Sequence, residues 1–116
     1  MLVVVNIKNV GVVEGSVYIG REMMWERKLL KGSVLRNQYR IGKNGDRDEV
    51  IEKYRVWLWE RIKERGVVYE KLMELVERDR RGEKVVLSCW CKPEPCHGDV
   101  VRKAVSWLSK SSGGVK

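Results

Sequence analysis

The sequence is short of several residue types: its 116 positions include no phenylalanine, one histidine, one glutamine, two prolines and three cysteines. It also lacks a long apolar run. The opening stretch Met1–Ile7 is far shorter than a membrane-spanning helix, which needs about 20 residues. A signal peptide has a basic segment before its apolar stretch, and no such segment precedes Met1–Ile7. Three cysteines within eight positions do not suit the disulfide framework of a small secreted protein. We therefore expect an intracellular, cytoplasmic protein with no membrane partner.

Nothing in the sequence divides it into separate parts, because it shows no internal repeat and no linker. A chain of this length buries roughly two-thirds of its unfolded surface, which is enough for one core. The sequence predicts a single domain over residues 1–110, followed by a disordered tail at 111–116. Glutamate outnumbers aspartate 12 to 4, and 34% of residues are charged. This bias is typical of hyperthermophiles, in which intracellular disulfides also occur.

The first half of the chain predicts two strands and a long loop. Leu2–Ile7 and Val17–Ile19 are rich in β-branched residues and end at turn-forming positions. Arg21–Gly45 shows no sustained period, so we expect a loop there, with one helical turn around Met23–Leu30. Loops of this length in small domains are usually functional or disordered.

The second half predicts helices on both sides of a buried strand. Asp46 and Glu49 have the spacing of a capping box, and the apolar period that follows stops at Gly66. Three further segments carry regular apolar patterns. They are a helix at Val68–Arg80, a strand at Val85–Trp90 that is apolar on both faces, and a last helix around Val101–Leu108. The sequence therefore predicts an α/β fold: a single small Rossmann-like domain with a mainly parallel sheet and helices packed on it.

The net charge of +8 is unevenly distributed. Arg21–Gly45 holds seven basic and two acidic residues, and Cys89–Lys116 has a further excess of three positive charges. Such an excess either keeps a surface soluble or attracts an anion, such as a phosphate, a nucleotide or a nucleic acid. Composition alone leaves both interpretations open.

All three cysteines and the single histidine lie within one stretch of eleven residues, Cys89–Asp99. Pro93 and Pro95 cannot donate to a sheet, so the strand must end before them and the chain must turn. Cys96 then falls at the N-cap or in the first turn of the last helix. Ligands of α/β proteins bind beyond the carboxyl ends of the strands, where this turn lies. The pattern therefore indicates a site at the turn.

Cys96, His97 and Asp99 are the candidate catalytic residues. A helix N-terminus stabilises a thiolate, so Cys96 is the candidate nucleophile and the thiol we expect to react first. His97 is placed to act as an acid or base, and Asp99 to help it position or exchange protons. Gly98 lets the backbone approach a ligand closely, and the N–H groups of the helix start suit a phosphate.

The same residues allow other interpretations. Cys89, Cys91, Cys96 and His97 are four ligands of the type that zinc accepts, although adjacent Cys96 and His97 cannot easily bind one ion. A cysteine inside a strand is also commonly a small apolar core residue, which we favour for Cys89. A Cys89–Cys91 disulfide is disfavoured, because Cα atoms two apart in a strand lie at about 7 Å, the upper limit for a bridge. We expect no cofactor, with zinc as the alternative.

The string CWCKPEPCHGD resembles a motif pair, CWC and PCHGD, of a family of uncharacterised small domains from bacteria, phages, archaea and archaeal viruses. Stretches at Val17–Arg21, Ile41–Gly45 and Arg47–Tyr54 extend the resemblance, which runs to Leu108. It implies kinship but no established activity. It draws attention to matching positions: Arg21, Asn37, Arg47, Glu49, Cys89, Trp90, Cys91, Cys96, His97, Gly98 and Asp99. Where family members read something like SPLGNPF, this chain has Ser33–Tyr39, so a ligand role for Asn37 does not follow from the family.

Together these features predict one pocket where three parts of the chain meet. They are the Cys91–Asp99 turn, the basic segment Arg21–Gly45 and the start of the first long helix at Arg47. We expect it to bind a nucleotide or a phosphate-bearing piece of nucleic acid, with or without catalysis. The expected ligand-binding residues are Arg21, Asn37, Lys43, Arg47 and Gly98. The alternative is a non-enzymatic nucleic-acid-binding or regulatory protein of a mobile element or virus, in which the three cysteines and His97 hold a structural zinc.

Overall fold

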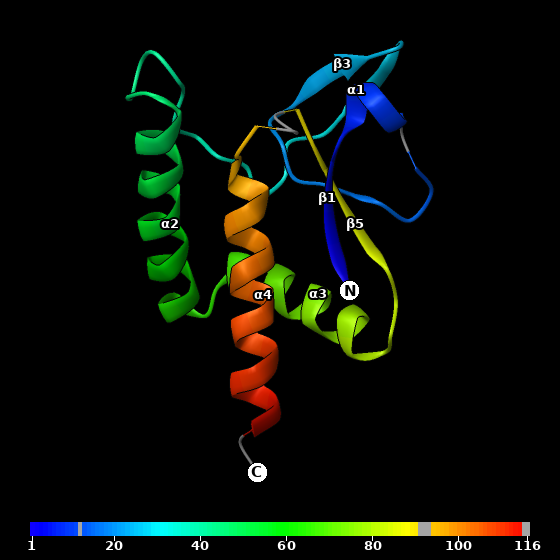
Figure 1. The fold of residues 1–116 in the computed structure, drawn as a ribbon, viewed down its shortest axis with the longest axis vertical. Coiled ribbons are helices and arrows are strands. Elements are labelled where there is room, and N and C mark those ends of the chain that lie inside the picture. Colours follow the sequence, from blue (N-terminus) through cyan, green and yellow to red (C-terminus); the bar gives the residue numbers. More distant parts are fainter. Residues whose placement is uncertain (12, 91–93, 115–116) are drawn as a thin grey trace.

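The computed structural model describes residues 1–11, 13–90 and 94–114, with side chains described up to residue 110. The described chain forms four helices and five strands (Figure 1). In order, they are β1 (Leu2–Asn6), α1 (Ile7–Val10), β2 (Val17–Tyr18), β3 (Met23–Trp25), β4 (Lys28–Leu30), α2 (Arg47–Glu64), α3 (Val67–Arg80), β5 (Val85–Cys89) and α4 (His97–Gly114). No helix in the described part of the chain is both long and apolar enough to cross a membrane.

The main sheet has three parallel strands in the order β1-β5-β2. The register pairs Leu2 with Val85 on one side of β5 and Val17 with Leu87 on the other. Because β5 has a neighbour on each side, it forms the centre of the sheet, as its apolar character on both faces predicts. The prediction of an α/β fold with a parallel sheet is confirmed. The Rossmann-like layering stays a prediction.

The basic segment holds a second, two-stranded sheet instead of the expected helical turn. Strands β3 and β4 pair antiparallel, with Trp25 opposite Lys28. The two residues between them, Glu26 and Arg27, have φ angles of 47° and 69°. Two positive φ angles in a two-residue loop form the mirror-image turn that matches the twist of a hairpin. The prediction of a helical turn around Met23–Leu30 was therefore wrong. The hairpin turn at Glu26 and Arg27 contains no glycine or asparagine, so the sequence gave no signal for it.

The helices begin close to where the sequence predicts. At the start of α2, the Asp46 side chain accepts from the Glu49 N–H at 2.9 Å, and the Glu49 side chain accepts from the Asp46 N–H at 2.8 Å, which confirms the capping box. The helix ends at Glu64, and the next residue, Arg65, has the left-handed conformation with φ 60°. Gly66 is the residue that precedes α3. The last helix continues to Gly114 and so reaches into the segment predicted as a tail.

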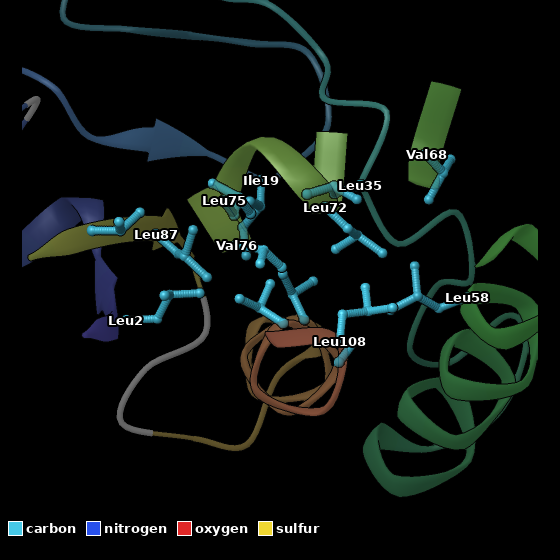
Figure 2. Packing of buried hydrophobic residues seen from close by; sticks show 14 of the residues in the cluster. Leu2, Ile19, Leu35, Leu58, Val68, Leu72, Leu75, Val76, Leu87 and Leu108 are labelled. Carbon is cyan, nitrogen blue, oxygen red and sulfur yellow. The ribbon is translucent and has the colours of Figure 1, made fainter. Parts of the chain in front are cut away.

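The core lies where α3 and α4 meet the sheet and where α2 packs against these two helices. Figure 2 shows Leu72, Leu75 and Val76 of α3 gathered with Leu108 of α4 and Leu87 of β5. These five side chains are almost completely buried, so they account for much of the hydrophobic stabilisation. Packing against this core fixes the start of α4 relative to the ends of the strands, and thereby positions the turn that carries the cysteine motif.

Candidate functional site

A pocket of about 330 Å³ opens where five parts of the chain converge. Its wall comes from the ends of β2 and β5, the starts of α2 and α4, and the loop at residues 37–41. Five of the residues predicted to be catalytic or ligand-binding line it: Arg21, Asn37, Arg47, Cys96 and His97. Cys89, a ligand in the zinc alternative, lines it as well. The expected meeting of the cysteine turn, the basic segment and the start of α2 is therefore present in the structure.

Arg47, the first residue of α2, is tied to the turn before α4. Its Nη1 donates to the carbonyl oxygen of Pro95 at 3.0 Å. The capping box fixes the backbone around Arg47, because the carboxyl groups of Asp46 and Glu49, one and two residues away, bond to backbone N–H groups. Arg47 thus spans the pocket edge between α2 and α4 and holds its guanidinium at the opening.

An aromatic cluster forms the wall beside Arg21. The Trp90 Nε1 donates to the Tyr18 hydroxyl at 2.7 Å, and that hydroxyl donates to the Arg21 carbonyl at 2.6 Å. Trp90 also meets the Trp25 ring edge to face at 5.2 Å, which joins the hairpin to the pocket. Burial raises the pKa of Tyr18, while the bond from Trp90 and the Arg21 charge oppose the rise. The chain of bonds fixes the backbone that carries Arg21.

Cys96 is the residue that precedes α4, as the sequence predicts, but its side chain is only 2% exposed. The sulfur lies 3.4 Å from that of Cys89, which is also buried at the end of β5. The Cys96 N–H donates to the carboxylate of Asp99 at 3.1 Å. Cys96 therefore belongs to the pocket floor, in van der Waals contact with a second thiol.

His97 is also buried and connects α4 to β2. Its Nε2 lies 2.6 Å from the carbonyl oxygen of Ile19, which requires a proton on that nitrogen. The imidazole meets the Tyr54 ring at 5.1 Å, edge to face. The Tyr54 hydroxyl in turn donates to the Leu35 carbonyl at 2.6 Å, and burial, with a smaller contribution from Cys96, raises its pKa. His97 thus fixes the spacing of the pocket floor as well as lining it.

Three of the predicted residues are not part of the lining of this pocket. Lys43 is exposed in the turn before α2, outside the wall. Gly98 is buried beneath the floor, where a Cβ atom would lie 2.7 Å from Val4 Cγ1. Asp99 borders a neighbouring groove between α2 and α4 and bonds to the backbone of Cys96. The structure therefore gives Gly98 and Asp99 contacts that shape the start of α4.

The loop at residues 37–41 supplies lining residues that the sequence did not single out. The Asn37 Oδ1 accepts from the Tyr39 N–H at 2.9 Å, and its Nδ2 donates to the Val50 carbonyl at 3.4 Å. These bonds fold the loop so that Tyr39 and Arg40 face the pocket. For Arg40, the only feature of the sequence that pointed to a role in ligand binding was its position in the basic segment Arg21–Gly45.

The zinc alternative depends on Cys91, which lies outside the described residues. Among the residues that are described, no group of three histidine, cysteine, aspartate or glutamate side chains is placed to hold a metal. The arrangement of Cys89, Cys96 and His97 with Cys91 as a fourth ligand thus stays a prediction.

Comparisons with known proteins confirm kinship with a family of uncharacterised domains and with a phage protein, while the CWC and PCHGD motifs as marks of that family stay a prediction. The family described as Domain of unknown function (DUF4326) matches residues 5–107. A relative, the "Uncharacterized 12.4 kDa protein in nrdA-td intergenic region" of Enterobacteria phage T4, is 37% identical over 71 residues, which cover 60% of this chain. The chain matches 59% of that relative's length. No solved structure matches this chain. With a family match over almost its whole length and a relative in a phage, the chain belongs to the DUF4326 family of domains of unknown function.

Proposed function

We propose that the pocket binds the phosphate groups of a nucleotide or of a nucleic-acid end. The observation that carries this proposal is the presence of three arginines, Arg21, Arg40 and Arg47, around one pocket. Within the described residues, none of the three forms an ion pair with a carboxylate, whereas four arginines of α2 and α3 do: Arg55, Arg61, Arg78 and Arg80. A guanidinium presents a fork of N–H donors that matches phosphate oxygens, so three unneutralised arginines favour a dianionic or trianionic ligand.

The size and the aromatic lining of the pocket suit a nucleotide rather than a bare phosphate. Its volume of about 330 Å³ lies at the lower end of the range typical of small-molecule sites, about 300–1,000 Å³. Tyr39 and Trp90 line it together with the arginines. Aromatic rings stack on the faces of nucleobases with little regard to sequence. A mononucleotide would thus place its phosphates on the arginines and its base on a ring.

The geometry favours binding over nucleophilic catalysis. The Cys96 sulfur is buried against Cys89, and the Nε2 of His97 is engaged with the Ile19 carbonyl. A nucleophile and its base would need to face a bound substrate within hydrogen-bond reach of each other. We therefore assign Cys96 and His97 to the pocket floor, with a catalytic role for the thiol as the secondary form of the proposal.

Isothermal titration of the full chain with ATP, AMP, adenosine and inorganic pyrophosphate tests the proposal. We expect affinity to rise with the number of phosphates and adenosine to bind weakest. The double variant Arg21→Met, Arg47→Met should lose most ATP affinity, by at least tenfold, because each charged hydrogen bond contributes about 1.5–3 kcal/mol.

The matched control is Arg55→Met, which removes an exposed arginine of α2 that pairs with Glu52 outside this pocket. It should bind ATP as the unmodified chain does. Equal losses in the double variant and the control would show a general charge effect. Failure of all phosphate compounds to bind at low salt would overturn the proposal.

A further inference from the structure

We propose that Cys89 and Cys96 are a redox-active thiol pair that closes to a reversible disulfide beneath the pocket. This inference does not depend on the identity of the pocket ligand. It rests on the 3.4 Å contact between the two sulfur atoms, which come from the end of β5 and the start of α4. Six residues lie between them in the chain, so the fold, and not local sequence, brings them together.

The contact is close to what a disulfide needs. A disulfide joins sulfurs at about 2.05 Å, so the two atoms need to approach by roughly 1.3 Å. Movements of this size lie within the reach of cysteine side-chain rotation and small backbone shifts. Both residues are also core positions, with Cys89 1% and Cys96 2% exposed, so neither thiol can leave the other without disturbing the packing. The core therefore holds the reaction partners together.

A route for an oxidant exists, because both cysteines line the pocket that opens to solvent. The pocket admits small molecules such as hydrogen peroxide, and it is lined by arginines that attract anions. A buried pair with no opening would react only after unfolding. Here Cys89 and Cys96 both line a pocket of about 330 Å³, which is large enough to hold several water molecules.

The chemistry balances with a peroxide as the oxidant. The thiolate of one cysteine attacks a peroxide oxygen, the O–O bond breaks, and the products are a sulfenic acid and water once a proton is taken up. The second thiol then loses its proton and attacks the sulfenic sulfur, forming the S–S bond and releasing a second water. Two thiols lose two electrons and two protons in total, and one peroxide is reduced to two waters. A dithiol such as dithiothreitol reverses the step by exchange.

The third cysteine provides the matched control. The variant Cys91→Ser keeps the proposed pair and removes the other thiol of the motif. Hydrogen peroxide is added to this variant in its native state and then removed. The protein is unfolded in urea with iodoacetamide, which blocks the remaining thiols, and is digested with chymotrypsin after dilution of the urea. Cleavage after Trp90 separates Cys89 from Cys96, so the two peptides stay together only if a disulfide joins them.

We expect a loss of two thiols per chain, a mass decrease of about 2 Da, and linked peptides that dithiothreitol separates. In the unmodified chain, the same Cys89–Cys96 link should predominate over any link to Cys91. Retention of both thiols, oxidation of Cys96 to a sulfinic acid, or links between different chains would each overturn the proposal. Because the test uses Cys91→Ser, it does not require a variant that alters the buried pair.

Discussion

At the scale of single residues, the floor of the pocket has very little spare room. Gly98 lies in the first turn of α4, packed between β1 and the residue that follows β2. A Cβ atom there would lie 2.7 Å from Val4 Cγ1, 3.0 Å from Ile19 Cδ1 and 3.3 Å from the sulfur of Cys96. The absence of a side chain therefore sets how closely the start of α4 approaches the sheet.

Replacing Gly98 with alanine should destabilise the protein by about 1–3 kcal/mol, because the added methyl group overpacks a buried contact. Urea denaturation measures the change. Gly66→Ala is the control, since a Cβ at that position meets nothing within 4 Å. Equal unfolding midpoints for the two variants would contradict the close packing at Gly98.

Tyr54 gives the core a dependence on alkaline pH. Burial raises its pKa above the ordinary value of about 10, because the phenolate would be desolvated. The stability that this group contributes is fully present below about pH 10 and is lost as the pH rises further, by up to about 1.4 kcal/mol per pH unit. Urea midpoints at pH 9, 10 and 11 should fall more steeply in the unmodified chain than in Tyr54→Phe. Parallel declines would show that other groups control alkaline unfolding.

The positions of several candidate site residues could be predicted from the sequence, whereas their roles stay predictions. Cys96 and His97 were identifiable because prolines end the strand before them, and Arg47 because it follows a capping residue. Burial was not identifiable: the sequence predicts Cys96 as an accessible thiol, whereas the structure buries it against Cys89. The contact between the two sulfur atoms forms because the end of β5 lies beside the start of α4. No local sequence pattern predicts that arrangement.

At the scale of elements, the helices and the buried strand were predictable, and the hairpin was not. The capping box and the apolar period define α2, and a continuous apolar run defines β5. Strands β3 and β4 have three residues each, and the turn between them uses Glu26 and Arg27, neither of which favours positive φ. Tertiary contacts such as Trp25 on Trp90 stabilise this hairpin.

This turn provides a prediction about the hairpin. The double variant Glu26→Asn, Arg27→Gly should raise stability by about 0.5–1 kcal/mol, because asparagine and glycine accept the positive φ angles of a mirror-image turn. The net charge stays unchanged, since one acidic and one basic residue are removed. Thermal unfolding followed by circular dichroism measures the effect. Arg27→Ala, which keeps an unfavourable residue in the turn, should not be stabilised; a lower melting temperature for the double variant would contradict the turn geometry.

At the scale of the whole molecule, the fold divides the basic segment into two parts. Arg21 and Arg40 line the pocket, whereas Lys28, Lys31 and Arg36 are exposed on or near the hairpin. The sequence predicted a local excess of charge but not this division, because it gave no signal for the hairpin that carries part of the charge. Binding of a small nucleotide and binding of a nucleic-acid chain should therefore depend on different residues.

If the protein binds single-stranded or duplex nucleic acid, the affinity should depend on salt and little on sequence, because phosphate contacts release counterions. Replacing Lys28, Lys31 and Arg36 with alanine should reduce the slope of log affinity against log salt by up to about 2–3. The same variant should bind ATP normally, since none of the three residues lines the pocket. Fluorescence anisotropy over a salt series measures the slope, and an unchanged slope would exclude the hairpin as the contact surface.

The most direct test of the arginine pocket is a two-dimensional NMR titration of the full, isotopically labelled chain with ATP. We expect the largest shifts at backbone amides around the pocket, namely those of Arg21, Tyr39, Arg47 and His97, and the double variant Arg21→Met, Arg47→Met should abolish them. Shifts that cluster on β3 and β4, or no saturable shifts at millimolar ATP and low salt, would contradict binding at the arginine pocket.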